Sequence, residues 1–216
     1  MTELLDDARL ERTAVVANSE MNRERRIGAY RRELGFDPTA WLTARPAPQR
    51  WLDVGCGSGR ALFDAAASLS GHVEIIGLDL VDFFAGPSRP GVDLLTGSVL
   101  TWQPQAPVEL ITAVHVLHYV GDKIAALTRM ASWLTADGQL VANFDASSIR
   151  WDDGSPIGRP FTTSLRRNGF QYDARNHRLT RTGYGLPRWE FRYLGADNHA
   201  GPNYTGQDSV AAHYRR

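Results

Sequence analysis

A glycine-rich turn is the feature of this sequence with the clearest chemical meaning. Residues 51–60 read WLDVGCGSGR, in which a short apolar segment precedes Gly55, Gly57 and Gly59. Glycines between a strand and a helix let the backbone approach a ligand closely, and the helix that follows presents unpaired N–H groups to that ligand. The pattern therefore predicts a ligand site at the start of a helix that begins near Arg60.

An acidic residue at the end of the next apolar segment narrows the type of ligand. Asp79 follows Gly59 by 20 positions. A carboxylate at that point accepts hydrogen bonds from the two hydroxyls of a ribose. The turn and Asp79 together predict a site for an adenosine-containing cofactor. A tight turn that needs glycine only for packing is the weaker alternative.

The spacing of the glycines and a second carboxylate distinguish two kinds of adenosine cofactor. A turn that binds a pyrophosphate prefers G-x-G-x-x-G, whereas residues 55–59 have glycine at every second position. Asp53, two residues before Gly55, would repel a pyrophosphate, but it suits a cofactor with cationic amine and sulfonium groups. These residues favour S-adenosylmethionine as the cofactor. The alternative is a nicotinamide dinucleotide, which would make the protein a nicotinamide-dependent dehydrogenase.

The same residues resemble the class I S-adenosylmethionine-dependent methyltransferases of the small-molecule type. Residues 52–60 are similar to the first motif of that family, and GLDL at 77–80 is similar to its ribose-binding turn. Its fourth-strand and fifth-strand regions are similar to ELITAVHVLHYV at 109–120 and ADGQL at 136–140. The resemblance covers about residues 50–145 and implies a Rossmann-like α/β fold with S-adenosylmethionine as the cofactor.

The resemblance implies roles for the residues of the glycine-rich turn. Asp53, Gly55 and Gly57 would hold the methionine part of the cofactor. Gly59 would close the turn, and Cys56, inside the turn, is expected to contact the cofactor as well.

The resemblance also implies roles for residues after the next strands. Asp79 would bind the ribose hydroxyls, and Leu80 would pack on the adenine. Ser98 stands where the family often has an acidic residue that binds the adenine amino group, so backbone groups of Val99 are expected to serve instead. The residues expected to flank the sulfonium are Val114 and His115.

Two side chains just after the predicted fourth strand are the candidate catalytic residues. Open α/β sheets bind ligands at the carboxyl ends of their strands. Methyl transfer mainly requires alignment of donor and acceptor and exclusion of water, and it needs a base only for an alcohol, a phenol or a protonated amine. We predict that His118 acts as that base or orients the substrate, and that Tyr119 contacts the substrate. The alternatives are a histidine bound to the local backbone and a tyrosine that only packs.

Apolar segments that alternate with helical ones must position these residues. Such alternation predicts a doubly wound, mostly parallel sheet with helices on both faces. The expected strands are residues 51–54, 73–79, 92–95, 110–114 and 140–144, and the expected helices are 60–69 and 123–134. We expect a single domain with a cofactor-binding core over residues 50–145.

The segments on either side of this core are expected to differ from it. Residues 1–45 are predicted to form a helical extension, with helices over 2–17 and 19–34. The resemblance implies that this extension closes over the cofactor as a lid, with Tyr30 or Arg31 reaching the methionine carboxylate. Asn22, Arg23 and Arg26 are expected on the face of Tyr30, and a merely solvated charged helix is the alternative. Residues 146–216 are predicted to contain a helix at 161–168, antiparallel strands at 171–175, 178–182 and 189–194, and an irregular surface tail from 195. His72, His177, His199 and His213 are expected at the surface.

Composition limits the possible functions. The 216 residues are 43% hydrophobic and 22% charged, and 24 basic residues balance 24 acidic ones. These values indicate a globular chain and give no global sign of nucleic acid or an anionic membrane as partner. The single cysteine excludes a disulfide framework and a cysteine-rich zinc site, and no histidine–carboxylate cluster suggests a metal. We expect a cytoplasmic monomer or homodimer.

The acceptor is expected to be an oxygen or nitrogen atom of a small molecule, in natural-product biosynthesis. His115-Val116-Leu117-His118 differs from the Pro-Pro-aromatic motif expected for amine methylation of a nucleic-acid base. Methylation of pyrimidine C5 needs a thiolate nucleophile, and the only thiol lies in the glycine-rich turn. An RNA or protein methyltransferase remains the alternative, supported by the basic and aromatic residues at 188–193.

Overall fold

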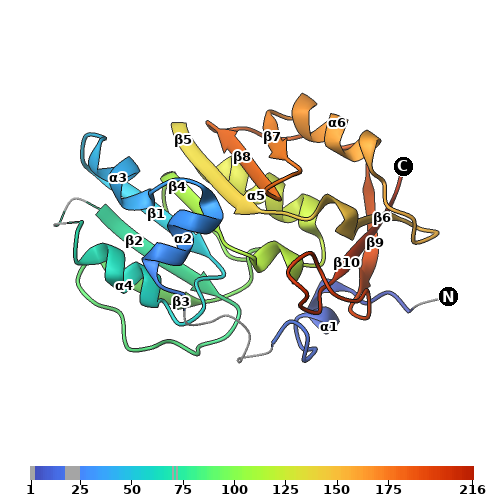
Figure 1. Cartoon of the computed structure of the whole chain (residues 1–216), viewed down its shortest axis with the longest axis horizontal. Helices are drawn as coiled ribbons and strands as arrows, with labels where there is room; N and C mark the ends of the chain where they lie inside the picture. Colours follow the sequence, from blue (N-terminus) through green and yellow to red (C-terminus); the bar gives the residue numbers. More distant parts are fainter. Residues whose placement is uncertain (1–2, 18–24, 70, 72) are drawn as a thin grey trace.

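A seven-stranded sheet forms the centre of the molecule, seen here in a computed structural model that describes residues 3–17, 25–69, 71 and 73–216 (Figure 1). The strand order is β3-β2-β1-β4-β5-β8-β7. In chain order, its strands are β1 (Gln49–Val54), β2 (Val73–Asp79), β3 (Val92–Thr96), β4 (Val108–Ala113), β5 (Leu134–Asn143), β7 (Phe170–Asp173) and β8 (Arg178–Thr182).

The pairing within this sheet confirms the predicted fold class. Strands β1 to β5 pair in parallel with their neighbours, whereas β8 is antiparallel to β5 and β7 is antiparallel to β8. The order of strands reverses between β1 and β4, and doubly wound sheets bind ligands at the carboxyl ends of the strands at such a point. The topology therefore predicts where the functional site lies.

Helices cover both faces of the sheet because its strands are apolar on both sides. Trp51 and Leu52 are neighbours in β1, so their side chains point to opposite faces, and both are fully buried. Trp51 packs with residues of α2 (Ile27–Leu34), α3 (Pro38–Thr43) and α4 (Arg60–Ala66). Leu52 belongs to the cluster that contains residues of α5 (Lys123–Trp133) and α6 (Arg159–Arg167). Burial of each such side chain contributes about 1.5–3 kcal/mol.

A second, three-stranded sheet corrects the prediction for the C-terminal tail. Its order is β6-β10-β9, with bounds Ile149–Trp151, Ala211–Arg215 and Arg192–Asp197. Strand β10 pairs in parallel with β6 and antiparallel with β9. The tail is therefore irregular only between β9 and β10, and its last strand is inside the fold, since Tyr214 is fully buried. Strand β10 lies between β9 and β6, and β6 is about 60 residues earlier in the chain, so the turn residues near β10 carry no sign of that pairing.

The N-terminal segment also differs from its prediction. In place of a helix over residues 2–17, only α1 (Asp7–Leu10) is helical, and the segment then continues in turns. Leu5 pairs with Ala196 of β9 through two backbone hydrogen bonds of 2.8 and 2.9 Å. The predicted second helix begins at Ile27, while residues 18–24, with Asn22 and Arg23, lie outside the described residues. Tertiary pairing at Leu5 thus replaces helical hydrogen bonds.

Two of the four histidines expected at the surface lie inside the fold. His213 is buried in β10, where its Nδ1 is 2.9 Å from the carbonyl oxygen of Trp151. His177 is partly buried, His199 is exposed as expected, and His72 lies outside the described residues. Among the helices of the described part of the chain, none has the length and apolar character that a membrane crossing requires.

Candidate active site

A cavity opens at the carboxyl ends of β3, β2, β1 and β4. Its volume, including the open mouth, is about 850 Å³, which suits a cofactor of drug size. Nine residues predicted for the site line it, namely Gly55, Gly57, Asp79, Leu80, Ser98, Val99, Val114, His115 and Tyr119. The other lining residues are Glu11, Val15, Val16, Arg25, Val54, Leu78, Gly97, Val116 and Val120.

Asp79 connects the second strand to the glycine-rich turn. Its Oδ2 accepts a hydrogen bond of 2.7 Å from the backbone N–H of Gly57, and its Oδ1 accepts one of 3.2 Å from Val81. Asp79 also lines the cavity at the end of β2, where a carboxylate is placed to accept hydrogen bonds from the hydroxyls of a ribose. Asp79 therefore both shapes the turn and presents acceptors to the cavity.

Gly55 is required by the shape of the turn. Its φ is +71°, and a Cβ atom at this position would lie 2.3 Å from the Cβ of Val116. The absence of a side chain lets the short 3₁₀ helix η1 (Val116–His118) approach the turn closely. A ligand on the turn therefore lies beside the residues that follow β4.

Two residues of the turn serve packing rather than the cavity wall. A Cβ atom on Gly59 would contact the side chain of Leu94 at 2.9 Å, so Gly59 lies against β3. The buried side chain of Cys56 belongs to the core cluster on the α4 side of the sheet. Neither residue lines the cavity, so the contact with the cofactor that was predicted for Cys56 is not part of this wall. Gly59 stands at the end of the turn, with its backbone nitrogen 3.1 Å from the carbonyl oxygen of Cys56.

Asp53 and Tyr30 form a buried pair beneath the site instead of lining it. Asp53 is fully buried and accepts hydrogen bonds from the Tyr30 hydroxyl at 2.6 Å and from Thr112 Oγ1 at 2.5 Å. Residues two apart on a strand share a face, so Asp53 points with Trp51 toward α2. The sequence thus contained a sign that this carboxylate lies away from the cavity.

Burial also changes the charge expected at Asp53. Desolvation raises the pKa of this carboxyl to about 7, although the hydrogen bonds from Thr112 and Tyr30 and the charge of Arg25 act in the opposite direction. Part of the population is therefore protonated at neutral pH. The full negative charge that the sequence argument placed under the turn is reduced, and the attraction for a cationic ligand depends on groups nearer the cavity.

Arg25 is a cavity residue that sequence reasoning missed. Its Nη1 donates a hydrogen bond of 3.0 Å to the carbonyl oxygen of Val114, and both residues line the cavity. The neighbouring arginines point elsewhere, with Arg26 2.8 Å from Asp64 and Arg31 3.0 Å from Asp37. Arginines occur at five of the ten positions from 23 to 32, so spacing alone does not single out Arg25.

His115 is held in a neutral state at the β4 end of the cavity. Its Nε2 lies 3.2 Å from the carboxylate of Glu33, and its Nδ1 lies 3.4 Å from the hydroxyl of Tyr204. Burial and the charge of Arg25 lower the pKa of His115 to about 4, although Glu33 acts in the opposite direction. A neutral ring that carries its proton on Nε2 satisfies both contacts, donating to Glu33 and accepting from Tyr204.

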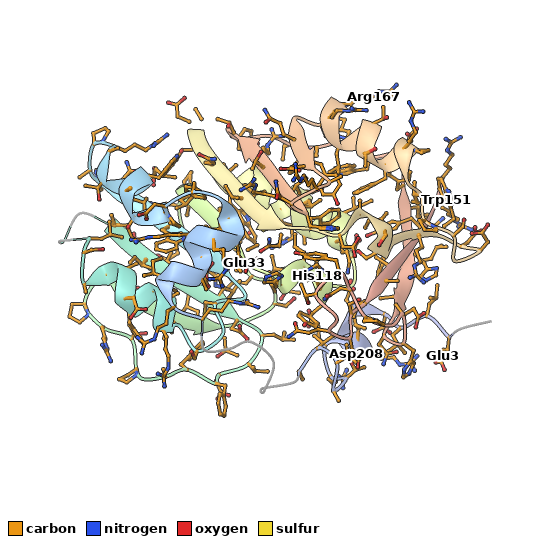
Figure 2. All side chains as sticks on the ribbon, viewed as in Figure 1. Glu3, Glu33, His118, Trp151, Arg167 and Asp208 are labelled. Atoms are coloured by element: carbon orange, nitrogen blue, oxygen red, sulfur yellow. The ribbon has the colours of Figure 1, made fainter. Side chains whose placement is uncertain are left out.

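His118 lies next to the cavity in a group of rings that we call the aromatic cluster (His115, His118, His177 and Tyr204). The ring of His118 is 5.1 Å from that of Tyr204 and 5.7 Å from that of His115, and His177 stacks on Tyr204 at 3.8 Å. His118 is only 1% exposed, and its Nε2 has no hydrogen-bond partner among the described residues. Figure 2 shows it near the middle of the molecule.

The state of His118 follows from this burial. Desolvation lowers its pKa to about 3, and the nearby basic groups of His115 and Lys123 act in the same direction by disfavouring a second positive charge. The imidazole is therefore neutral at pH 7, and its buried Nε2 lies without a partner among the described residues, next to the cavity-lining residues His115 and Tyr119. Within the described ranges, no three His, Cys, Asp or Glu side chains are grouped so as to hold a metal ion.

Acidification should destabilise the fold through His118. Its pKa is about 3 in the folded state and about 6.5 when unfolded, so the unfolded chain binds the proton first as the pH falls. The stability that the neutral, buried His118 contributes is therefore complete above about pH 6.5 and is lost as the pH falls toward 3. Between pH 7 and 4.5 the free energy of unfolding should fall by roughly 2–3 kcal/mol more in the wild type than in His118→Phe.

Urea denaturation at several pH values measures this difference. The exposed His199 provides the control, and His199→Phe should keep the pH dependence of the wild type. Parallel curves for the wild type and His118→Phe would show that His118 takes up its proton equally in both states.

Comparison with known proteins places these residues in a family context. A family model described as a methyltransferase domain matches residues 21–190. Over 94 residues the chain is 29% identical to trans-aconitate 2-methyltransferase from Rhizobium rhizogenes, a match that covers 42% of this chain and 36% of the relative. The chain thus spans about a third of the length of that curated relative in the match.

Solved methyltransferase structures are also similar. The N-methyltransferase NodS from Bradyrhizobium japonicum, in complex with S-adenosylhomocysteine, is 17% identical, with a TM-score of 0.49 and coverage of 81% of this chain and 95% of that chain. An amino pentose methyltransferase from Micromonospora echinaspora is 28% identical, with a TM-score of 0.41 and coverage of 54% of each chain.

Proposed function

We propose, from the premise that this chain belongs to the methyltransferase-domain family, that it transfers a methyl group from S-adenosylmethionine to an oxygen or nitrogen atom of a small molecule. The observation that carries the proposal is the cavity at the carboxyl ends of β1, β2 and β4, which joins the glycine-rich turn, Asp79 and Arg25. We place the reaction in natural-product biosynthesis in the cytoplasm.

The chemistry of the cavity wall fits this cofactor. Asp79 presents acceptors for the two ribose hydroxyls, and the Arg25 guanidinium is suited to the methionine carboxylate. Gly55 and Gly57 contribute no side chains, which leaves room for the amino-acid part beside the turn. When bound, S-adenosylmethionine supplies a methyl group activated by a sulfonium.

The aromatic cluster then defines the acceptor side of the site. His118 precedes Tyr119 of the cavity wall and would either orient the acceptor by a hydrogen bond or take a proton from it. Because its pKa is lowered to about 3, it is a weak base, and orientation is the role we favour. Tyr119 lines the cavity beside it and donates a hydrogen bond of 3.3 Å to Gln207. This bond and the contact between the rings of His118 and Tyr204 attach the loop before β10 to the residues that follow β4.

A small acceptor is favoured over RNA. The curated relative is a trans-aconitate methyltransferase by name, which supports a small organic acceptor. The aromatic residues at 188–193 were the basis of the RNA alternative, but their rings have other partners. Trp189 stacks on Phe161 and donates to Thr128 Oγ1 at 2.8 Å, and Phe191 is buried in the core. Rings held in this way do not offer free faces to bases.

Calorimetry with the purified chain tests the proposal. S-adenosylmethionine and S-adenosylhomocysteine should bind with micromolar dissociation constants, and NAD should give no heat of binding. The reverse result would overturn the proposal and favour a nicotinamide-dependent enzyme.

A further inference from the structure

The N-terminal segment brings a carboxylate into the cofactor cavity. Leu5 pairs with Ala196, and Asp7 accepts hydrogen bonds from the Tyr193 hydroxyl at 2.9 Å and from the backbone N–H of Asp122 at 3.0 Å. These contacts anchor the segment on the side of the three-stranded sheet. From there it crosses to the cavity, where Glu11 forms part of the wall.

Glu11 is fixed at the β3 end of the cavity by one hydrogen bond. The hydroxyl of Ser98 donates to Glu11 Oε1 at 2.5 Å and accepts from the backbone N–H of Leu100 at 3.1 Å. Because the Leu100 N–H fixes the orientation of the hydroxyl, the carboxylate is fixed in turn. The other oxygen, Oε2, accepts from none of the described residues, so it is open to a donor from a ligand.

The walls around Glu11 are suited to a flat ring. Leu80 follows β2, Val99 follows β3, and Val15 and Val16 come from the N-terminal segment, so apolar side chains from separate elements surround this end. Asp79 lies between this end and the glycine-rich turn. A base attached to a ribose that Asp79 holds would therefore extend toward Glu11.

We propose that Glu11 recognises the exocyclic amino group of the bound adenine, so that the N-terminal segment supplies the carboxylate that selects the base. A carboxylate accepts a hydrogen bond from an amino group and repels a carbonyl oxygen at the same place. Glu11 thereby provides an acidic group next to Ser98, from a segment 87 positions earlier in the chain. This inference rests on the proposed cofactor.

Paired ligands test the inference by binding alone. Calorimetry with the full chain would compare S-adenosylhomocysteine with S-inosylhomocysteine, in which a carbonyl oxygen replaces the amino group. The wild type should bind the adenine compound at least about tenfold more tightly, as expected for one charged hydrogen bond. In Glu11→Gln this ratio should fall to about one to three, because an amide both donates and accepts.

Two further variants complete the experiment. Ser98→Ala removes the group that fixes Glu11 and should lower the ratio of the two affinities at least about threefold. Glu3→Gln changes an exposed carboxylate in the same segment, paired with Arg9, and should keep the ratio of the wild type. Thermal melting without ligand shows whether each variant folds. If Glu11→Gln does not fold, the ratio measured for Ser98→Ala decides the result.

The outcomes separate the two proposals. A wild type that binds S-adenosylhomocysteine without discriminating between the bases would overturn the role of Glu11 and leave the proposed function standing. If Glu11→Gln keeps the wild-type ratio of the two affinities, the role of Glu11 is likewise overturned and the proposed function still stands. A wild type that binds neither compound would instead contradict the proposed function itself.

Discussion

Replacement of Asp79 by alanine should weaken the binding of S-adenosylhomocysteine by roughly 30-fold or more. Two effects act in the same direction. The ribose hydroxyls lose their acceptors, which costs about 1–3 kcal/mol, and about 1.4 kcal/mol corresponds to a factor of ten. The backbone N–H groups of Gly57 and Val81 also lose their partner, so the glycine-rich turn is no longer tied to β2.

Calorimetric titration of the variant measures the loss. Asp93→Ala is the matched control, because Asp93 is an exposed carboxylate on the neighbouring strand β3, and its affinity should equal that of the wild type. Thermal melting without ligand distinguishes the two effects, because a loosened turn lowers the melting temperature of the free protein and a lost ribose contact does not. An affinity that Asp79→Ala leaves unchanged would remove Asp79 from the cofactor site.

Replacement of His118 by alanine should reduce turnover by roughly 100-fold, the loss expected when the acceptor is no longer held in line with the methyl group. Binding of S-adenosylhomocysteine should change by less than about twofold, because His118 does not line the cofactor cavity. This separation of turnover from cofactor affinity is the result that a merely structural histidine would not give.

The reaction would be followed as formation of S-adenosylhomocysteine, with the fastest acceptor from a panel of small phenols, alcohols and amines. His199→Ala, at an exposed position, should retain wild-type turnover. Because burial lowers the pKa of His118 to about 3, its protonation should not limit the wild-type rate between pH 5 and 8. Undiminished turnover in His118→Ala would exclude His118 both as the orienting group and as the base and leave Tyr119 as the candidate.

Lys123, the only lysine of the chain, illustrates a group that the sequence did not mark. It is fully buried at the start of α5, where Nζ donates to the carbonyl oxygen of Val120 at 2.6 Å. Burial lowers its pKa to about 7, against the opposing effect of Asp145, Asp7 and Asp122. Its charge contributes to keeping His118 neutral. Charged side chains in a sequence are expected in water, and only the packing around α5 places this one inside.

The core of the fold and the central part of the site were predictable because they depend on neighbouring residues. The period of apolar residues predicted β1 to β5, and glycines at alternate positions predicted the turn. The position of Asp79 in the site was predictable for a similar reason. Asp79 ends β2, and the carboxyl end of a strand that runs parallel to β1 must lie next to the glycine-rich turn. Local backbone preferences and side-chain period are properties of consecutive residues.

The tertiary structure alone decided which distant groups meet at the site. It brought Glu11 to Ser98 and Arg25 to Val114, and it stacked His177 on Tyr204. These contacts join residues 27 to 89 positions apart, and they form only when separate segments pack against the same edge of the sheet. Consecutive residues specify turns and period, whereas the pairing of distant segments depends on the packing of the whole chain.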